Sequence, residues 1–198
     1  MSATAYKVLG YERHSHHGGT GVWTPGKWRT VEGPLAACSH GIHYCDRSQL
    51  VQWLGPTICR FEDGTPAETV NAGDKMVTRK GRIVERLEAW NETTARLFAA
   101  DVAEIALVHI PESHRGPFVA AINAARGFAR GEIGDKERAA AWDAARAAAW
   151  DAARDAAGAA ARDAAWAAAW AAAWAAAGDA ARAIQTEILF DYLEGRRA

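Results

Sequence analysis

The sequence predicts an α+β protein, in which a small antiparallel β-sheet domain (residues 1–90) is followed by an alanine- and tryptophan-rich α-helical bundle (residues 91–198). Two observations support this. The first part holds most of the glycines and all three cysteines, with short β-branched and aromatic runs between turn formers, as is typical of short strands. After residue 90 apolar side chains recur every three or four residues, and 29 of the 45 residues in 139–183 are alanine, the best helix former.

In the first part, five runs rich in β-branched and aromatic residues predict strands. They cover residues 5–12, 41–45, 57–62, 75–78 and 82–88. The dipeptide Lys80-Gly81 predicts a hairpin turn, because glycine adopts the positive φ that a tight turn requires.

One short helix is expected within this sheet domain, over residues 47–54. Asp46 is a suitable N-cap, Gln49 completes a capping-box pattern three residues later, and Gly55-Pro56 ends the segment.

The second part predicts a succession of helices. Apolar residues in 91–110 have helical spacing up to Pro111, and a further helix is expected over 118–130, interrupted by Gly127. A third helix begins after Gly134, with Asp135 as its cap. An amphipathic turn closes the chain, and its apolar positions are Ile184, Ile188, Leu189 and Tyr192.

The alanine-rich segment has an internal period of four residues. Trp142 and Trp150 occupy this grid, and so do Trp166, Trp170 and Trp174. Each step advances the marked side chain by about 40° around a helix, so the tryptophans spiral and a simple coiled coil is disfavoured. We expect either a packed bundle, with a bend or break near Gly158, or self-association, with Trp166, Trp170 and Trp174 as binding residues.

Composition excludes several classes of protein. The formal net charge of -1 lacks the basic excess of a nucleic-acid-binding protein. The uncharged stretch 164–178 is shorter than the roughly 20 residues that a bilayer requires, so no membrane association is expected. Three cysteines and the absence of a signal-peptide pattern in the first residues favour the cytoplasm.

Two segments resemble sequences of unknown function. Cys38 followed by Gly41-Ile42-His43-Tyr44-Cys45 resembles the core of an uncharacterised domain common in phages and their bacterial hosts. The run Ala-Arg-Ala-Ile-Gln-Thr-Glu-Ile-Leu (residues 181–189) resembles alanine-rich helical segments of bacterial and phage proteins. The resemblance implies a phage-type protein in the host cytoplasm and brings no assigned activity.

Two groups of residues are candidate sites. The side chains of Cys38, His40, His43 and Cys45 are all zinc-ligand types, but their spacing is unlike that of structural zinc sites. The prediction is therefore no metal, with buried cysteines and a hydrogen-bonded histidine. Trp23, Trp28 and Arg29 are candidate binding residues, because they could form a wall for a planar ligand.

The strand with Tyr44, followed by a helix, is also similar to a strand of ADP-ribosyltransferases, in which a tyrosine stacks on nicotinamide. This resemblance implies NAD as cofactor, stacking by Tyr44 and ribose binding by His43 or His14, with only Glu85 and Glu88 as loose candidates for the catalytic glutamate. The first hypothesis is nevertheless a non-enzymatic accessory protein, without a cofactor, that binds a host macromolecule or a small ligand. Its helical part would mediate packing, self-association or contact with a protein partner. The ADP-ribosyltransferase-like enzyme is the alternative.

Overall fold

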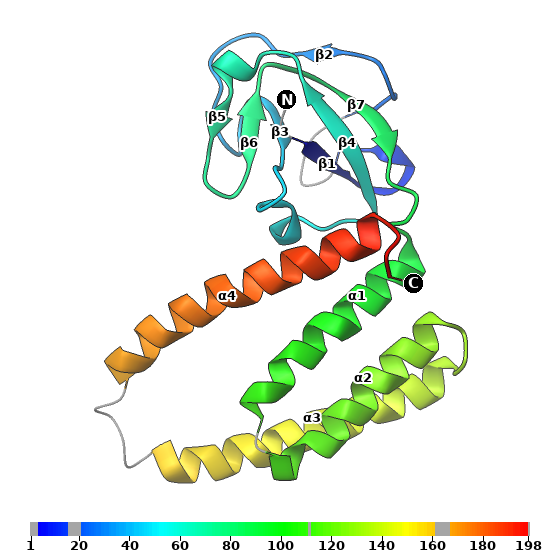
Figure 1. Ribbon diagram of the computed structural model, residues 1–198, viewed down its shortest axis with the longest axis vertical. Helices are drawn as coiled ribbons and strands as arrows, with labels where there is room; N and C mark the ends of the chain where they lie inside the picture. Colours follow the sequence, from blue (N-terminus) through cyan, green and yellow to red (C-terminus); the bar gives the residue numbers. More distant parts are fainter. Residues whose placement is uncertain (1–3, 16–20, 111, 161–166, 198) are drawn as a thin grey trace. The chain divides into compact units, whose positions relative to one another are not determined.

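The computed structural model describes residues 4–15, 21–110, 112–160 and 167–197. It confirms an α+β fold, with antiparallel sheets and helices (Figure 1). The chain forms two compact units, one of Met1–Asn91 with Leu189–Arg197 and the other of Glu92–Ile188. The sequence predicts that all of residues 91–198 belong to the helical domain, whereas Leu189–Arg197, which includes the end of the last helix, belongs to the first unit.

The first unit contains two small antiparallel sheets, in the orders β1-β4-β7-β2 and β3-β6-β5. Backbone hydrogen bonds of 2.8 Å in both directions between Tyr6 and Cys45 join the edge of one sheet to the other. The strands are β1 (Ala5–Leu9), β2 (Arg29–Thr30), β3 (Ile42–Tyr44), β4 (Thr57–Asp63), β5 (Val70–Asn71), β6 (Met76–Thr78) and β7 (Lys80–Arg86).

One core cluster of this unit lies on one face of the larger sheet. Because strand side chains alternate, Ala5 and Leu9 of β1 point to the same face and are buried there. They pack with side chains from the loop after β1 and from three other strands, namely Trp23, Ile42, Cys59, Phe61 and Ile83.

The hairpin predicted at Lys80-Gly81 is wrong. Both residues lie inside β7, where they pair with Thr30 and Arg29 of β2. Neither β2 nor β5 was predicted from the sequence. A Cβ on Gly81 would lie 2.1 Å from the Phe61 ring. This position therefore requires glycine because β7 packs closely on β4, and Gly81 does not adopt a positive φ.

The helix predicted over residues 47–54 is wrong in extent, although its cap forms. Asp46 Oδ1 accepts hydrogen bonds from the backbone N–H groups of Ser48 and Gln49, and Gln49 Oε1 accepts one from the Asp46 N–H. Only a 3₁₀ helix, Leu50–Gln52, follows these turns. The segment is too short for an α-helix to be stable by its own hydrogen bonds.

The second unit contains α1 (Glu92–Ile105), α2 (Arg115–Ala129), α3 (Asp135–Ala160) and most of α4 (Ala167–Leu193). Helix α2 packs on both α1 and α3. Arg126 of α2 donates to Asp101 of α1 at 2.7 Å and to Glu104 at 2.6 Å. Within the described residues, no helix is long and apolar enough to span a membrane.

The interruption predicted at Gly127 is wrong, whereas the alternative of a bend or break near Gly158 falls next to residues 161–166, which lie outside the described part of the chain. Helix α2 continues through Gly127, which is buried close to Ile133. Helix α3 includes Gly158 and ends two residues later, at Ala160.

Only one tryptophan of the four-residue grid has a described side chain. Trp142 of α3 is 65% exposed. Trp166 and the side chains of Trp150, Trp170 and Trp174 lie outside the described residues, so the binding role predicted for Trp166, Trp170 and Trp174 has no structural account.

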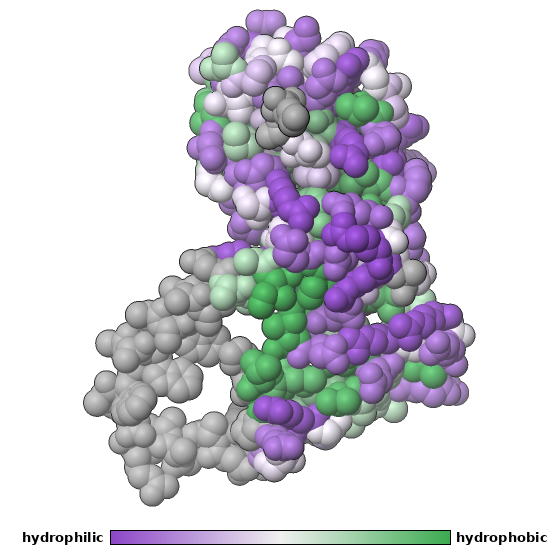
Figure 2. All heavy atoms as spheres, in the orientation of Figure 1, coloured by the Kyte–Doolittle hydropathy of each residue, from purple (hydrophilic) through white to green (hydrophobic). Residues whose placement is uncertain are grey.

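Figure 2 shows hydrophobic residues gathered over α1.

Candidate functional site

The larger cavity described in the first unit has a volume of about 740 Å³, within the range of small-molecule sites. It lies between β1, β3 and the loops that precede β2, β3 and β6. Its lining includes three basic side chains, two histidines and several aromatic or aliphatic groups, and none of the described lining residues is acidic. The side chains that give the cavity its charge and its aromatic surfaces are Lys7, Trp23, Arg29, His43, Trp53 and Lys75.

Lys7 brings a positive charge into an otherwise apolar strand. Its position on β1 gives it the same face as Ala5 and Leu9, and its Nζ donates to the His43 carbonyl oxygen at 2.5 Å. Burial lowers the pKa of Lys7 to about 8, and the charge of Arg29 acts in the same direction. In the described part of the chain no carboxylate is within ion-pair distance of this ammonium group.

Trp23 holds two cations at the cavity. The Lys7 Nζ lies 5.0 Å and the Arg29 guanidinium carbon 4.5 Å from its ring, and its Nε1 donates to Ser15. The Trp23 side chain is only 3% exposed, so it is not an open stacking surface. Its contribution is cation–π attraction that positions the charges.

The predicted wall of Trp23, Trp28 and Arg29 is therefore only partly correct. Trp23 and Arg29 come together, but Trp28 lies outside the cavity, where Lys80 and Arg82 pack over its ring. The reason is the turn that contains Gly26, which has a φ of +76° and reverses the chain between the two tryptophans.

Lys75 provides the third cation and differs from Lys7 in having an acidic partner. Its Nζ lies 3.1 Å from Asp74 Oδ2 and 4.3 Å from the Trp53 ring centre. Burial opposes its charge, but hydrogen bonds with the side chains of Asp74 and Cys38 raise its pKa overall. Trp53 is fixed by its Nε1, which donates to the Asp74 carbonyl oxygen at 2.8 Å.

The cysteine and histidine cluster of the sequence is dispersed around the cavity. His43 Nε2 accepts a hydrogen bond from the Cys38 backbone N–H at 3.1 Å, and the His40 ring contacts the Glu32 carbonyl oxygen at 2.5 Å. Burial, with the charges of Lys7 and Lys75, lowers the pKa of His43, which favours the neutral ring. Among the described residues, no three histidine, cysteine or acidic side chains converge as a metal site would require.

The cysteine thiols differ in exposure. Cys38 is exposed, whereas Cys45 and Cys59 are buried. Burial raises the pKa of Cys45 to about 12 and that of Cys59 to about 11. These two groups stay protonated near neutral pH and are therefore poor nucleophiles.

The residues implied by the ADP-ribosyltransferase resemblance are only partly brought together. His43 and Tyr44 line the cavity and His14 does not. The Tyr44 ring is already stacked on Phe61, with ring centres 4.8 Å apart, and its hydroxyl donates to Asp63 at 3.0 Å. Burial and Asp63 raise the pKa of Tyr44 to about 12.

The glutamates implied by the same resemblance lie in ion pairs. Glu85 is 2.7 Å from Arg60, and Glu88 is 3.4 Å from Arg86. Neither lines the cavity.

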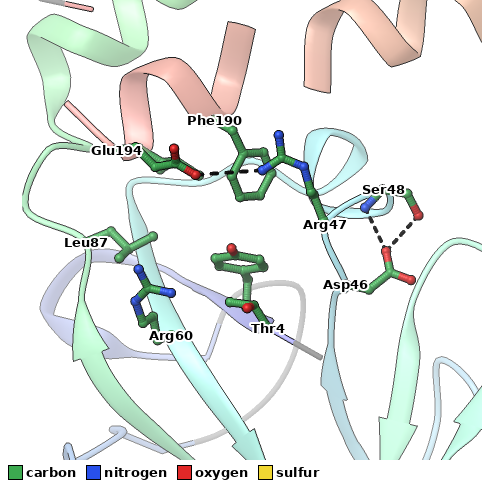
Figure 3. Close-up of a pocket in the computed structure, with 10 residues that line it drawn as sticks. Thr4, Asp46, Arg47, Ser48, Arg60, Leu87, Phe190 and Glu194 are labelled. Carbon is green, nitrogen blue, oxygen red and sulfur yellow. Dashed lines mark hydrogen bonds and ion pairs between the residues drawn. The ribbon is translucent and has the colours of Figure 1, made fainter. Parts of the chain in front are cut away.

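A second pocket in the same unit, of about 470 Å³, has compensated charges. Arg47 lies beside Phe190 and Glu194 (Figure 3). Its guanidinium carbon is 3.7 Å from the Phe190 ring centre and its Nη1 is 3.8 Å from Glu194 Oε1. Arg60 on its other side pairs with Glu85. Because its arginines already have acidic partners, this pocket is a weaker candidate for an anion than the larger cavity.

Sequence reasoning missed three site residues, Lys7, Lys75 and Trp53. A signal for Lys7 was present, because a lysine stands at the centre of the apolar strand Ala5–Leu9. Lys75 and Trp53 approach each other only through the fold, since 22 residues separate them along the chain.

Comparisons with protein-family models, curated proteins and solved structures find no match for this chain.

Proposed function

We propose that this is a non-enzymatic binding protein whose first unit takes up a small organic anion, such as a carboxylate or phosphate ester with an apolar body. The observation that carries the proposal is the pair Lys7 and Arg29, two cations held on one buried tryptophan beside a cavity whose described lining has no acidic residue.

Desolvated charge favours the binding of an anion here. A cation removed from water is destabilised unless an opposite charge or hydrogen bonds replace its hydration. Lys7 has a carbonyl partner, and the Arg29 guanidinium donates to the Val22 carbonyl oxygen. An anion entering the cavity would supply the missing counter-charge, while Val8, Val31 and Ile42 would contact its apolar part.

Thermal shift and calorimetric titration with phosphate monoesters and aromatic carboxylates, each compared with its uncharged alcohol, test this function. We expect the anions to raise the melting temperature and the alcohols not to do so. Arg29→Gln should weaken anion binding about 10- to 100-fold, the usual loss for one charged hydrogen bond. Lys27→Gln, at an exposed lysine of the same loop, should bind like the wild type.

Two outcomes would contradict the function. One is that no anion stabilises the protein more than its alcohol does. The other is that Arg29→Gln and Lys27→Gln weaken binding equally. Arg29→Lys, which retains the charge, separates a loss of binding from a loss of local structure.

A second proposal concerns the helical unit, in which Trp142 and Val108 are 65% and 70% exposed. We propose that these side chains contribute to a self-association surface. Light scattering at micromolar concentration should give a mass above the 21.3 kDa of one chain, and Trp142→Glu should lower it. A 21.3 kDa species for the wild type would exclude self-association under those conditions.

A further inference from the structure

We propose that Lys7 forms a reversible imine with the carbonyl group of an anionic aldehyde or ketone bound in the larger cavity. This inference rests on the proposed function, because it requires the cavity to bind an organic anion. It adds the class of ligand and the atom that captures it.

The position of Lys7 distinguishes it from the other lysines of the chain. Its amine lines the cavity, lies against the Trp23 ring and donates a hydrogen bond to the His43 carbonyl oxygen. Lys75 lines the same cavity but is paired with Asp74, and Lys80 lies over Trp28 outside it. The remaining lysines, Lys27 and Lys136, are exposed.

The surroundings of Lys7 favour the neutral amine, which is the nucleophile. Burial and the nearby Arg29 charge lower its pKa to about 8. At about pH 7.5 this leaves roughly a quarter of the side chain unprotonated, against about one part in a thousand for an ordinary lysine. Desolvation and a neighbouring cation are the two usual means by which proteins activate a lysine toward carbonyl groups.

The reaction balances without any further reagent. The Lys7 Nζ lone pair attacks the carbonyl carbon and forms a carbinolamine. The former carbonyl oxygen takes one proton from the Lys7 nitrogen and one from solvent water and leaves as water, and a protonated carbon–nitrogen double bond remains. No electron transfer occurs, and hydrolysis reverses the step. The anionic group of the ligand would pair with Arg29, which shares the Trp23 ring with Lys7.

Reductive trapping in the full chain tests the inference, with pyridoxal 5′-phosphate as the probe. This compound combines an aldehyde, a planar ring and a phosphate. After borohydride reduction at about pH 7.5, peptide mass spectrometry reads the labelled fraction of each lysine. We expect substoichiometric probe to label Lys7 at least about tenfold more than Lys27 or Lys136, because its free-amine fraction is larger.

Pyridoxine 5′-phosphate supplies the matched control, since it has the same ring and phosphate but no aldehyde. It should bind without forming an adduct and should protect Lys7 from labelling. Arg29→Gln should reduce the labelling of Lys7 and leave that of Lys27 unchanged. Lys7→Met should remove the selective label altogether.

The outcomes separate this inference from the proposed function. If pyridoxine 5′-phosphate binds and Lys7 is not labelled above Lys27, the imine is wrong and anion binding stands. If it neither binds nor protects, and labelling is unselective, the imine is wrong and anion binding fails for this ligand. If Lys7 is labelled selectively without protection, its reactivity does not depend on a bound anion, and the inference is again overturned.

Discussion

Lys7 shows how one residue sets the electrostatics of the cavity. Strand alternation turns it toward the face that buries Ala5 and Leu9, so its ammonium group leaves water for a carbonyl oxygen and an indole ring. Burial therefore lowers its pKa to about 8. Because burial penalises the charged form, a protonated Lys7 destabilises the folded state. We infer that Lys7 serves ligand capture and not stability.

The lowered pKa of Lys7 predicts a specific pH dependence of stability. The unfolded chain holds this proton up to the ordinary lysine pKa of 10.5, whereas the folded chain releases it near pH 8. Between these values the unfolded state binds more protons, so the free energy of unfolding rises with pH, by up to about 3 kcal/mol from this group. Below about pH 8 the destabilisation by the charge is present in full.

Lys7→Met isolates this effect. Its stability relative to the wild type should be most favourable below about pH 8 and should decline as the pH approaches 10.5. Urea unfolding of both proteins across this range measures the difference. Lys27→Met, at an exposed lysine, should show no such trend. A Lys7→Met difference that does not change with pH would contradict the assigned cause.

Among the elements, those whose local pattern agrees with their packing could be predicted from the sequence. The start of α3 at Asp135 and the strand β4 lie within a residue of the expected positions, because helix-forming residues follow Gly134 and a β-branched run forms β4. Asp135 is the first residue of α3 and its carboxylate pairs with Arg138, so the cap predicted at this residue is wrong. Strands β2 and β5, of two residues each, form only because a partner strand supplies their hydrogen bonds. No local pattern predicts such pairing, and the cavity beside β2 could not be foreseen for the same reason.

The segment after β3 shows an element defined by its cap. Asp46 Oδ1 accepts hydrogen bonds from the Ser48 N–H at 2.8 Å, the Ser48 hydroxyl at 2.7 Å and the Gln49 N–H at 2.9 Å. The buried Gln49 side chain in turn donates to the Gly73 carbonyl oxygen at 3.0 Å. The cap thereby ties this turn to the loop that carries Lys75.

Asp46→Ala should lower the free energy of unfolding by about 1 to 2 kcal/mol, because it leaves backbone N–H groups without their acceptor. Chemical denaturation followed by tryptophan fluorescence measures the loss. Ser48→Ala removes only the hydroxyl donor and should lower stability by less than about 1 kcal/mol. Equal effects of the two substitutions would show that the carboxylate does not act as a cap.

At the scale of the whole molecule, the first unit is built from both ends of the chain. Leu189–Arg197 belongs with Met1–Asn91, although nearly a hundred residues separate these segments in sequence. The sequence predicts strands in the first segment and helix in the second, but it carries no information on this return of the chain. Bringing two distant segments together costs chain entropy. Only the buried contacts of the packed core offset that cost, so no local pattern indicates the pairing.

Phe190 is the aromatic anchor of this returning segment. It is 1% exposed, its ring lies 5.2 Å from that of Tyr6, and the Arg47 guanidinium carbon lies 3.7 Å from its ring centre. Phe190→Ala should lower the free energy of unfolding of the first unit by about 3 to 5 kcal/mol. Ile184→Ala, six residues earlier in the same helix at a side chain 48% exposed, should lower it by less than about 1 kcal/mol. Hydrogen exchange resolved by peptide should show faster exchange in β1 and β4 for Phe190→Ala alone. Unchanged protection of these strands would mean that the first unit folds without its C-terminal segment.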